Sequence, residues 1–239
     1  MKRRRNLSAR RSGLWIARQL AYDPRSLWYR PMPHTADITA VVAQIESMFT
    51  AYGHESYGEN CTQLQHAQQC GTLALQRGLG EELALAAFLH DIGHFIARRR
   101  AIDEVDAYGY ARHNELGADF LQAHGFSDRI VEVVREHVRA KRYLCAVSQG
   151  YIEKLSDASR VTLEQQGGPM SPAEAASYRR HPNLADIIQL RQLDDTGKLP
   201  DMPCPPLSFW LRLAREQLEA AATSSDRDPG PCGFNRASA

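Results

Sequence analysis

The stretch LALAAFLHDIGHFI, residues 83–96, decides the fold class. Its apolar residues cover nearly the whole circumference of a helix, which predicts a helix in the core of the domain rather than at its surface. A His-Asp pair, His90 and Asp91, interrupts the apolar run, and His94 follows on the same helix face as His90. An adjacent imidazole and carboxylate are costly to bury unless a partner offsets their desolvation, and a metal cation is the usual partner.

Helical periodicity continues on both sides of this stretch, and no alternating pattern of useful length predicts a strand. Neither a G-x-G-x-x-G sequence nor a P-loop is present. The sequence therefore predicts an all-α protein with one core and about eight to ten helices. We expect these helices at residues 37–50, 62–77, 81–96, 109–124, 127–138, 151–155, 171–179, 184–193 and 207–222.

The composition of the two ends sets the expected boundaries of this helical domain at residues 34–222. The first eighteen residues contain seven Arg or Lys and no acid. That pattern is typical either of a targeting or surface-binding arm or of a disordered extension, and we expect residues 1–33 to be the extension. Residues 223–239 have the composition of turns, which predicts a disordered tail.

The whole-chain composition excludes several classes of protein. A formal net charge of +1 over 239 residues points to neither nucleic acid nor a membrane surface. No run of about 18 apolar residues predicts a spanning helix. The five cysteines include no C-x-x-C pair, which is typical of reduced thiols in the cytoplasm. We therefore expect a cytoplasmic protein without nucleic-acid or membrane partners.

Further metal-ligand residues accompany the His-Asp pair on other predicted helices. His66 lies on the preceding helix, His113 opens the next one in RHNELGADFL, and His137 follows in VVREHVRAKRY. Asp194 comes late, in IIQLRQLDD. Each lies in an otherwise apolar helix. The alternative interpretation is that His90 is a core histidine that is merely capped by its neighbour Asp91. The presence of these further ligand-type residues makes that interpretation the less favoured one. The order His, His-Asp, His, His and Asp resembles the HD superfamily of metal-dependent phosphohydrolases over about residues 37–220.

The number of ligands predicts two metal ions. If Asp91 bridges, the four histidines, the bridge and Asp194 supply about seven bonds, which leaves about five of the twelve positions around two six-coordinate ions. Imidazole and carboxylate without thiolate suit iron, manganese or another first-row ion, and disfavour a structural zinc site. The open positions would take substrate, water or dioxygen.

A closer resemblance is to the PhnZ-type HD oxygenases, which cleave carbon–phosphorus bonds with a mixed-valent Fe2+/Fe3+ pair. The motifs that carry it are YGENCTQLQHA (57–67), HDIGH (90–94), HVRAKRY (137–143), SDASRVTLEQQGGPMS (156–171) and RQLDDTGK (191–198). The resemblance implies a substrate of the 1-hydroxy-2-aminoalkylphosphonate class, with dioxygen as co-substrate and phosphate and a carboxylate as products. It implies these iron ligands: His66, His90, Asp91, His113, His137 and Asp194.

The same resemblance implies the residues that contact the substrate. Lys141 and Arg191 would be cations for the phosphonate, with hydroxyl groups from Ser159 and Thr162. His94 would contact the substrate rather than a metal, and His94 and Lys141 would be the catalytic residues. Glu59 is expected to meet the substrate's ammonium group, and Tyr57 is also expected to contact the substrate.

The loop before His66 departs from the family pattern. There the family carries a tyrosine three residues before the glutamate, and this tyrosine occupies an iron position until substrate arrives. Here Ser56 stands at that position, and Tyr57 lies two residues before Glu59. Either the loop shifts so that Tyr57 takes the role of the family's tyrosine, or this tyrosine ligand is absent.

Other interpretations stay open from the sequence. Asp157, in KLSDAS, imitates the closing aspartate of plain HD phosphohydrolases, and Asp195 is a further alternative to Asp194. The alternative function is a metal-dependent phosphohydrolase of a nucleotide or other phosphate ester, with Mn, Mg or Zn generating the hydroxide nucleophile. A third possibility is a non-catalytic protein that binds a phosphorylated ligand.

Overall fold

The structure is a computed structural model that describes residues 35–199 and 201–225 of the chain. The expected extension (1–33) and residues 226–239 of the expected tail lie outside the described residues. The helices are α1 (Thr35–Tyr52), α2 (Gln63–Gln76), α3 (Glu81–Leu89), α4 (Ile92–Arg99), α5 (His113–Ala123), α6 (Asp128–Val147), α7 (Tyr151–Lys154), α8 (Asp157–Gln165), α9 (Pro172–Tyr178), α10 (Leu184–Thr196) and α11 (Leu207–Ser225). A hairpin of two short antiparallel strands, β1 (Val105–Asp106) and β2 (Gly109–Tyr110), stands between α4 and α5. The all-α prediction is confirmed.

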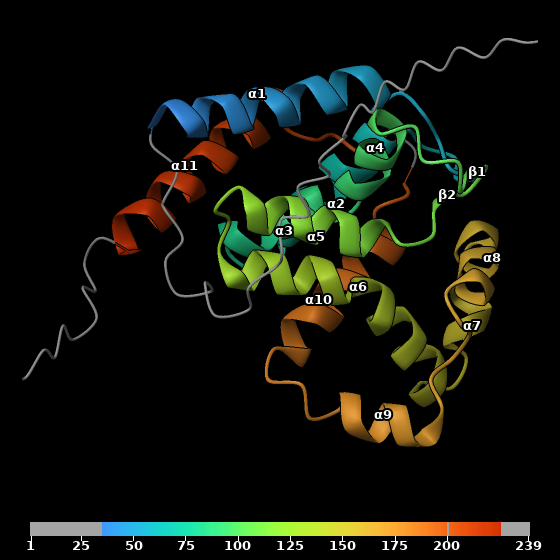
Figure 1. Cartoon of the computed structure of the whole chain (residues 1–239). Coiled ribbons are helices and arrows are strands. Elements are labelled where there is room, and N and C mark those ends of the chain that lie inside the picture. Colours follow the sequence, from blue (N-terminus) through green and yellow to red (C-terminus); the bar gives the residue numbers. More distant parts are fainter. Residues whose placement is uncertain (1–34, 200, 226–239) are drawn as a thin grey trace, which may run out of the picture. The chain divides into compact units, whose positions relative to one another are not determined.

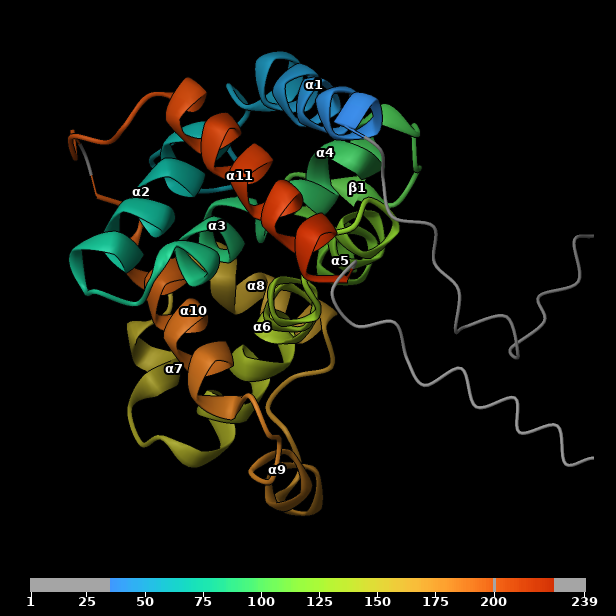
Figure 2. The ribbon, with the colours of Figure 1, turned by 90° about the vertical axis from the view of Figure 1, so that its left-hand side faces the viewer.

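Helix α3 lies at the centre of the bundle, in contact with α2, α6, α10 and α11 (Figures 1 and 2). Every residue from Leu83 to Leu89 is buried, as the apolar stretch predicts. The Phe88 ring stacks between Phe49 of α1 and Trp210 of α11, with centroid distances of 4.6 Å and 5.0 Å. Trp210 reaches this position because α2 offers it Gly71, where a Cβ atom would lie 2.4 Å from the indole. The bundle core thus holds α3 rigidly.

The predicted helix through residues 81–96 is wrong in one respect, because the structure breaks it at the His-Asp pair. α3 ends at Leu89, and Asp91 takes the N-cap position of α4 with φ −98° and ψ 5°. The break turns the Asp91 carboxylate into the pocket beside His90, which an unbroken helix would rotate by about 100° away from it. Gly93 then lets α5 approach, since a Cβ atom there would lie 1.9 Å from the His113 carbonyl oxygen.

Two other helix boundaries differ from the sequence prediction by several residues, and one helix was not predicted. The β hairpin occupies the start of the expected 109–124 helix, so α5 begins only at His113. α6 continues to Val147, beyond the expected end at Val138, and therefore carries Lys141 as well as His137. α8 was not predicted, although Ser156 is a typical N-cap whose hydroxyl accepts a hydrogen bond from the Ser159 amide. α8 brings a hydroxyl-bearing helix face to the pocket.

Across the described part of the chain, the helices are all too short or too polar to cross a membrane.

Candidate metal centre

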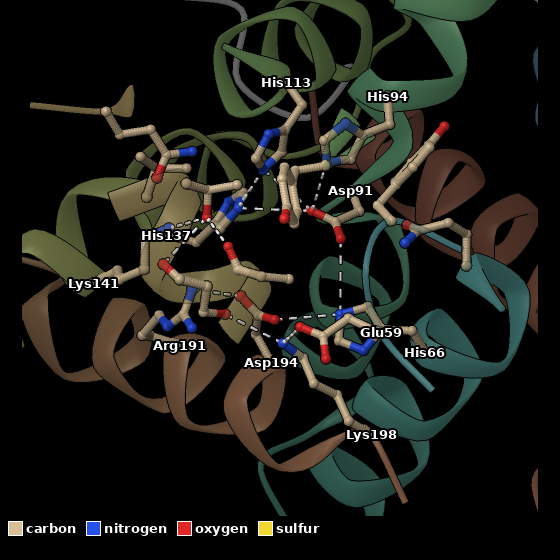
Figure 3. Close-up of a pocket in the computed structure, with 18 of the residues that line it drawn as sticks. Glu59, His66, Asp91, His94, His113, His137, Lys141, Arg191, Asp194 and Lys198 are labelled. Atoms are coloured by element: carbon tan, nitrogen blue, oxygen red, sulfur yellow. Dashed lines mark hydrogen bonds and ion pairs between the residues drawn. The ribbon is translucent and has the colours of Figure 1, made fainter. Parts of the chain in front are cut away.

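The structure brings all six predicted metal ligands together: five of them line one pocket (Figure 3), and His90 is fully buried beside them. They come from separate elements: α2, the α3–α4 junction, the first residue of α5, the middle of α6 and the end of α10. Each of the six has a side-chain nitrogen or oxygen atom within 3.0–3.8 Å of such an atom in at least one other member of the set. These six residues are His66, His90, Asp91, His113, His137 and Asp194.

The two carboxylate oxygens of Asp91 face two different pairs of histidines. Oδ2 lies 3.4 Å from His90 Nε2 and 3.7 Å from His66 Nε2. Oδ1 lies 3.2 Å from His113 Nε2 and 3.8 Å from His137 Nε2. Ligand atoms at bond lengths of about 2.1 Å stand roughly 3.0–3.5 Å apart around one ion. The spacing therefore fits two ions, one in each half of the cluster, with Asp91 between them.

Asp194 completes the half formed by His66 and His90. Its Oδ1 lies 3.3 Å from His66 Nε2 and 3.8 Å from His90 Nε2. Its other oxygen accepts a hydrogen bond of 2.7 Å from Arg191. One carboxylate oxygen is thus held by the guanidinium while the other faces the pocket.

The two alternatives to Asp194 lie elsewhere. The Asp157 side chain is 97% exposed at the start of α8, where it pairs with Arg160. Asp195 accepts hydrogen bonds from Arg191 and from the Tyr151 hydroxyl group. Neither carboxylate is among the groups that face the four imidazoles.

The main chain fixes the protonation of the four histidines. Each Nδ1 atom lies against a backbone carbonyl oxygen, at 2.7–2.9 Å: His66 on Gly197, His90 on Ala87, His113 on Tyr110 and His137 on Val134. A carbonyl oxygen only accepts, so each Nδ1 carries the proton and each Nε2 presents a lone pair to the pocket. Three of the four carbonyls belong to the residue three positions earlier, Ala87 in α3, Val134 in α6 and Tyr110 in β2, so these contacts are local in the backbone.

Lone pairs that face one another across short distances need a positive charge between them, which either an added proton or a metal ion supplies. His113 Nε2 and His137 Nε2 are 3.0 Å apart, and His66 Nε2 and His90 Nε2 are 3.3 Å apart. With both Nδ1 protons engaged, neither pair has a proton left to share in the neutral state. A positive metal ion in each half satisfies all four nitrogens at once.

The electrostatics of the cluster agree with a cation site. Burial opposes ionisation of Asp91, yet His90 and His113 hold the pKa of its carboxyl group well below the usual range. Arg191 does the same for the buried carboxyl group of Asp194. Burial also opposes a charge on His90, but Asp91 and then Asp194 outweigh it and raise the pKa of His90 to about 9. The carboxylates are thus ionised and strongly attract positive charge, which a metal would supply.

Comparison with known proteins identifies the family. The model of the HD domain matches residues 64–187, which is just over half of the chain. This chain belongs to the HD-domain family.

Three relatives of this HD-domain protein cover most of it. A [1-hydroxy-2-(trimethylamino)ethyl]phosphonate dioxygenase (glycine-betaine-forming) of Leisingera caerulea is 42% identical over 71% of this chain and 85% of its own length. A hydroxymethylphosphonate dioxygenase of Gimesia maris is 36% identical over 74% of this chain and 88% of its own. An uncharacterized protein of Acanthamoeba polyphaga mimivirus is 34% identical over 77% of this chain and 84% of its own length. The family resemblance predicted from the sequence is confirmed.

Beside the six candidate metal ligands, the pocket of this HD-domain protein carries two lysines over one face of α8. Lys141 is only 3% exposed, and its ammonium group donates to the Thr162 hydroxyl at 2.9 Å. Lys198 donates to Glu59 at 2.6 Å and lies 3.3 Å from the Ser159 hydroxyl. Two ammonium groups and two hydroxyls so close together form a site for an anion with several oxygen atoms.

The sequence did not single out Lys198, although it ends the quoted segment RQLDDTGK. It lies past the end of α10, one residue after Gly197, whose carbonyl oxygen fixes His66. Burial opposes its charge, but Asp194 and Glu59 together raise the pKa of Lys198, so it is a cation at neutral pH. The only available signal was its position four residues beyond Asp194.

Arg191 was expected to contact the substrate, and the structure gives it other partners. It lines the pocket but is 3% exposed. Its three guanidinium nitrogens donate to Asp194, to Asp195 and to the Tyr151 hydroxyl group. In this structure its contact with Asp194 orients that carboxylate so that the other oxygen faces His66 and His90.

The hydroxyl group of Tyr57 does not point at the six candidate metal ligands. The hydroxyl donates to Glu55 at 2.8 Å, and Glu55 in turn pairs with Arg98 on α4. The Tyr57 ring instead lies against the imidazole of His94, with a centroid distance of 4.8 Å. Together with Tyr108, which also lines the pocket, it forms an aromatic wall beside Glu59.

Proposed function

We propose that this HD-domain protein is a diiron oxygenase that cleaves the carbon–phosphorus bond of a 1-hydroxy-2-aminoalkylphosphonate to give phosphate and a carboxylate. The observation that carries the proposal is the bridged pair of half-sites around Asp91, next to a site for an anion. The names of two relatives support it, because both are dioxygenases of hydroxylated phosphonates. The relatives also support the expectation that the chain is an enzyme.

The donor set suits iron, as it suits manganese and other first-row metals. All six candidate ligands offer imidazole nitrogen or carboxylate oxygen. The nearby Cys70 thiol donates to the Leu193 carbonyl oxygen, and burial raises its pKa well above the usual value, so it supplies no thiolate. Bound between these residues, a pair of iron ions would supply the redox chemistry with dioxygen.

The protein's own residues would bind and orient the substrate. Lys141 and Lys198, with the hydroxyl groups of Ser159 and Thr162, would hold the phosphonate oxygens. Arg191 would keep one oxygen of Asp194 turned away from the pocket, and we therefore propose for it a positioning role in addition to the pocket wall. The phosphonate would thus be fixed beside the cluster, with C1 and its hydroxyl group directed toward the metal ions.

The other end of the substrate would meet Glu59 and the aromatic wall of Tyr57 and Tyr108. A carboxylate beside aromatic rings suits an ammonium group. In the structure Glu59 is paired with Lys198, so a zwitterionic substrate would exchange partners with this ion pair: its phosphonate would take Lys198 and its ammonium group would take Glu59.

We also propose that the protein works in the cytoplasm on small molecules, without nucleic-acid or membrane partners. The described cysteines, Cys61, Cys70, Cys145 and Cys204, are all free thiols, as expected in a reducing compartment. The test of the proposed function is phosphate release from a 1-hydroxyalkylphosphonate with and without dioxygen. Turnover of a phosphate ester without dioxygen would instead indicate the phosphohydrolase.

Replacing Lys141 with methionine is expected to weaken phosphonate binding without changing the metal content. Methionine keeps most of the buried volume but removes a charge-assisted hydrogen bond worth about 1.5–3 kcal/mol, so KM should rise roughly ten- to a hundredfold. Steady-state kinetics and metal analysis measure the two quantities. Lys154→Met, an exposed lysine on α7, is the matched control. An unchanged KM would remove Lys141 from the substrate site.

The activity should also fall as the pH rises through about 7. Burial, and then the charge of Arg191, lower the pKa of Lys141 to about 7. The group is therefore cationic below that pH and neutral above it, and only the cation attracts the phosphonate. We expect kcat/KM to decrease above about pH 7, and we expect Lys141→Arg to keep its charge and shift this limb to higher pH. An unshifted limb in Lys141→Arg would assign the titration to another group.

A further inference from the structure

The main chain of one residue in the β hairpin, Tyr110, contacts two imidazoles of the pocket. The Tyr110 amide N–H donates to His94 Nδ1 at 2.9 Å. The Tyr110 carbonyl oxygen lies 2.8 Å from His113 Nδ1. The two imidazole rings are stacked on each other, with centroids 3.9 Å apart and an angle of 21° between their planes. Two nearly parallel histidines are therefore held by opposite ends of the same residue.

The two contacts demand opposite protonation of the two rings. An amide N–H only donates, so His94 Nδ1 must present a lone pair, and the ring proton of neutral His94 is on Nε2. A carbonyl oxygen only accepts, so His113 Nδ1 carries the proton and its Nε2 has the lone pair. Both Nε2 atoms face Asp91 Oδ1, at 3.2 Å from His113 and 3.9 Å from His94. One stacked ring thus presents a lone pair, and the other presents an N–H group.

We propose that the main-chain N–H and C=O groups of Tyr110 select the tautomers of this pair, and so make His113 a metal ligand and His94 a hydrogen-bond donor. Distance alone does not separate them, because both Nε2 atoms lie within reach of the same carboxylate oxygen. The N–H of His94 is then available to an oxygen atom bound beside His113 and His137. That last role rests on the proposed function, in which the oxygen atom belongs to the phosphonate substrate or to dioxygen.

The hairpin is built to approach His94 this closely. Gly109 has φ +90°, which glycine adopts readily and other residues rarely do. A Cβ atom at Gly109 would lie 2.4 Å from His94 Nδ1, so a side chain there would separate the hairpin from the imidazole. Asp106 fastens the turn by accepting from the Tyr108 amide and from Gln165 of α8. The hairpin therefore positions the main chain of Tyr110 against His94.

Imidazole 15N NMR of the full chain, loaded with diamagnetic Zn2+, tests the tautomers directly. We expect His94 to show an unprotonated Nδ1 and a protonated Nε2, while His66, His90, His113 and His137 show protonated Nδ1 atoms. A His94→Gln variant assigns the His94 signals. A protonated Nδ1 at His94 would overturn the proposal. This readout needs no substrate, so it stands or falls independently of the phosphonate activity.

Gly109→Ala tests the role of the hairpin, with Gly80→Ala as its matched control. Gly80 has φ +86°, and a Cβ atom there would meet nothing within 4 Å, so it carries the backbone strain without the clash. We expect Gly109→Ala to lose the unprotonated Nδ1 signal of His94, and to lower kcat at least about tenfold more than the control does. An unchanged His94 signal in Gly109→Ala would contradict the selection by the hairpin. If Gly109→Ala does not fold, the spectrum of the unmodified protein still shows whether Nδ1 of His94 is protonated, and so still tests the proposed tautomer.

Discussion

Replacing Asp91 with alanine is expected to release both metal ions, not one. Its two carboxylate oxygens face different pairs of histidines, so it is the residue through which the two halves of the cluster would share a ligand. Without it each half loses an anionic donor, and the buried imidazoles are left with less negative charge to balance a cation. The loss of oxygenase activity should be complete. Metal analysis of protein purified without air, expressed as ions per chain, measures the effect.

Two further variants make this result specific. Asp157→Ala removes an exposed aspartate and should keep about two ions per chain. Asp194→Ala removes a donor from the His66–His90 half only, and should lower the content toward one ion. Circular dichroism checks that each variant is folded. A full, tightly bound pair of ions in Asp91→Ala would contradict the bridging role, whatever the activity.

Exclusion of dioxygen should abolish phosphate release from a 1-hydroxy-2-aminoalkylphosphonate. Oxidation of C1 to a carboxylate needs an oxidant, and the reaction balances with one dioxygen consumed for each phosphate formed. One oxygen atom of the carboxylate should then come from the gas. Phosphate assays under air and under nitrogen, with mass spectrometry of the product formed under labelled dioxygen, measure both quantities.

The hydrolase alternative predicts the opposite pattern. A metal-activated hydroxide needs no oxidant, so a phosphate ester would be cleaved equally fast under nitrogen and under air. That result would overturn the oxygenase proposal while leaving the metal centre intact. If two irons are bound and every hydroxyphosphonate tested is inert, the error lies in the substrate. The different loop at Ser56 and Tyr57 is where we would then look for its cause.

The sequence predicted the parts of the site that depend on local pattern. The apolar stretch at 83–96 predicts that its His-Asp pair lies inside the domain, and His90 is indeed fully buried while the Asp91 side chain is 18% exposed. The histidines on neighbouring helices follow from their position in apolar faces. The break at Asp91 was missed, because helix propensity does not report the tertiary contact with α5 that Gly93 permits. The choice between Asp194 and Asp157 was made by resemblance, and the structure places Asp194, not Asp157, beside the histidines.

Other features depend on partners that are distant in the sequence. Lys198 meets Glu59 across 139 residues, so neither residue alone predicts the ion pair. Tyr57 could have reached the cluster as far as sequence spacing tells, and it is Glu55 and Arg98 that draw its hydroxyl group away. The protonation of His94 depends on a backbone N–H, which every residue except proline carries, and therefore leaves no signature in the sequence.

The carbonyl contacts of the four cluster histidines have a consequence for how such a protein can evolve. A point mutation exchanges a side chain but leaves a peptide carbonyl in place, so the groups that orient these imidazoles are sheltered from most substitutions. The groups that we propose for the far end of the substrate are side chains, Tyr57, Glu59 and Tyr108, and each can be replaced singly. Under the proposed function, selection could therefore change which phosphonates are accepted while the orientation of the four imidazoles is inherited unchanged.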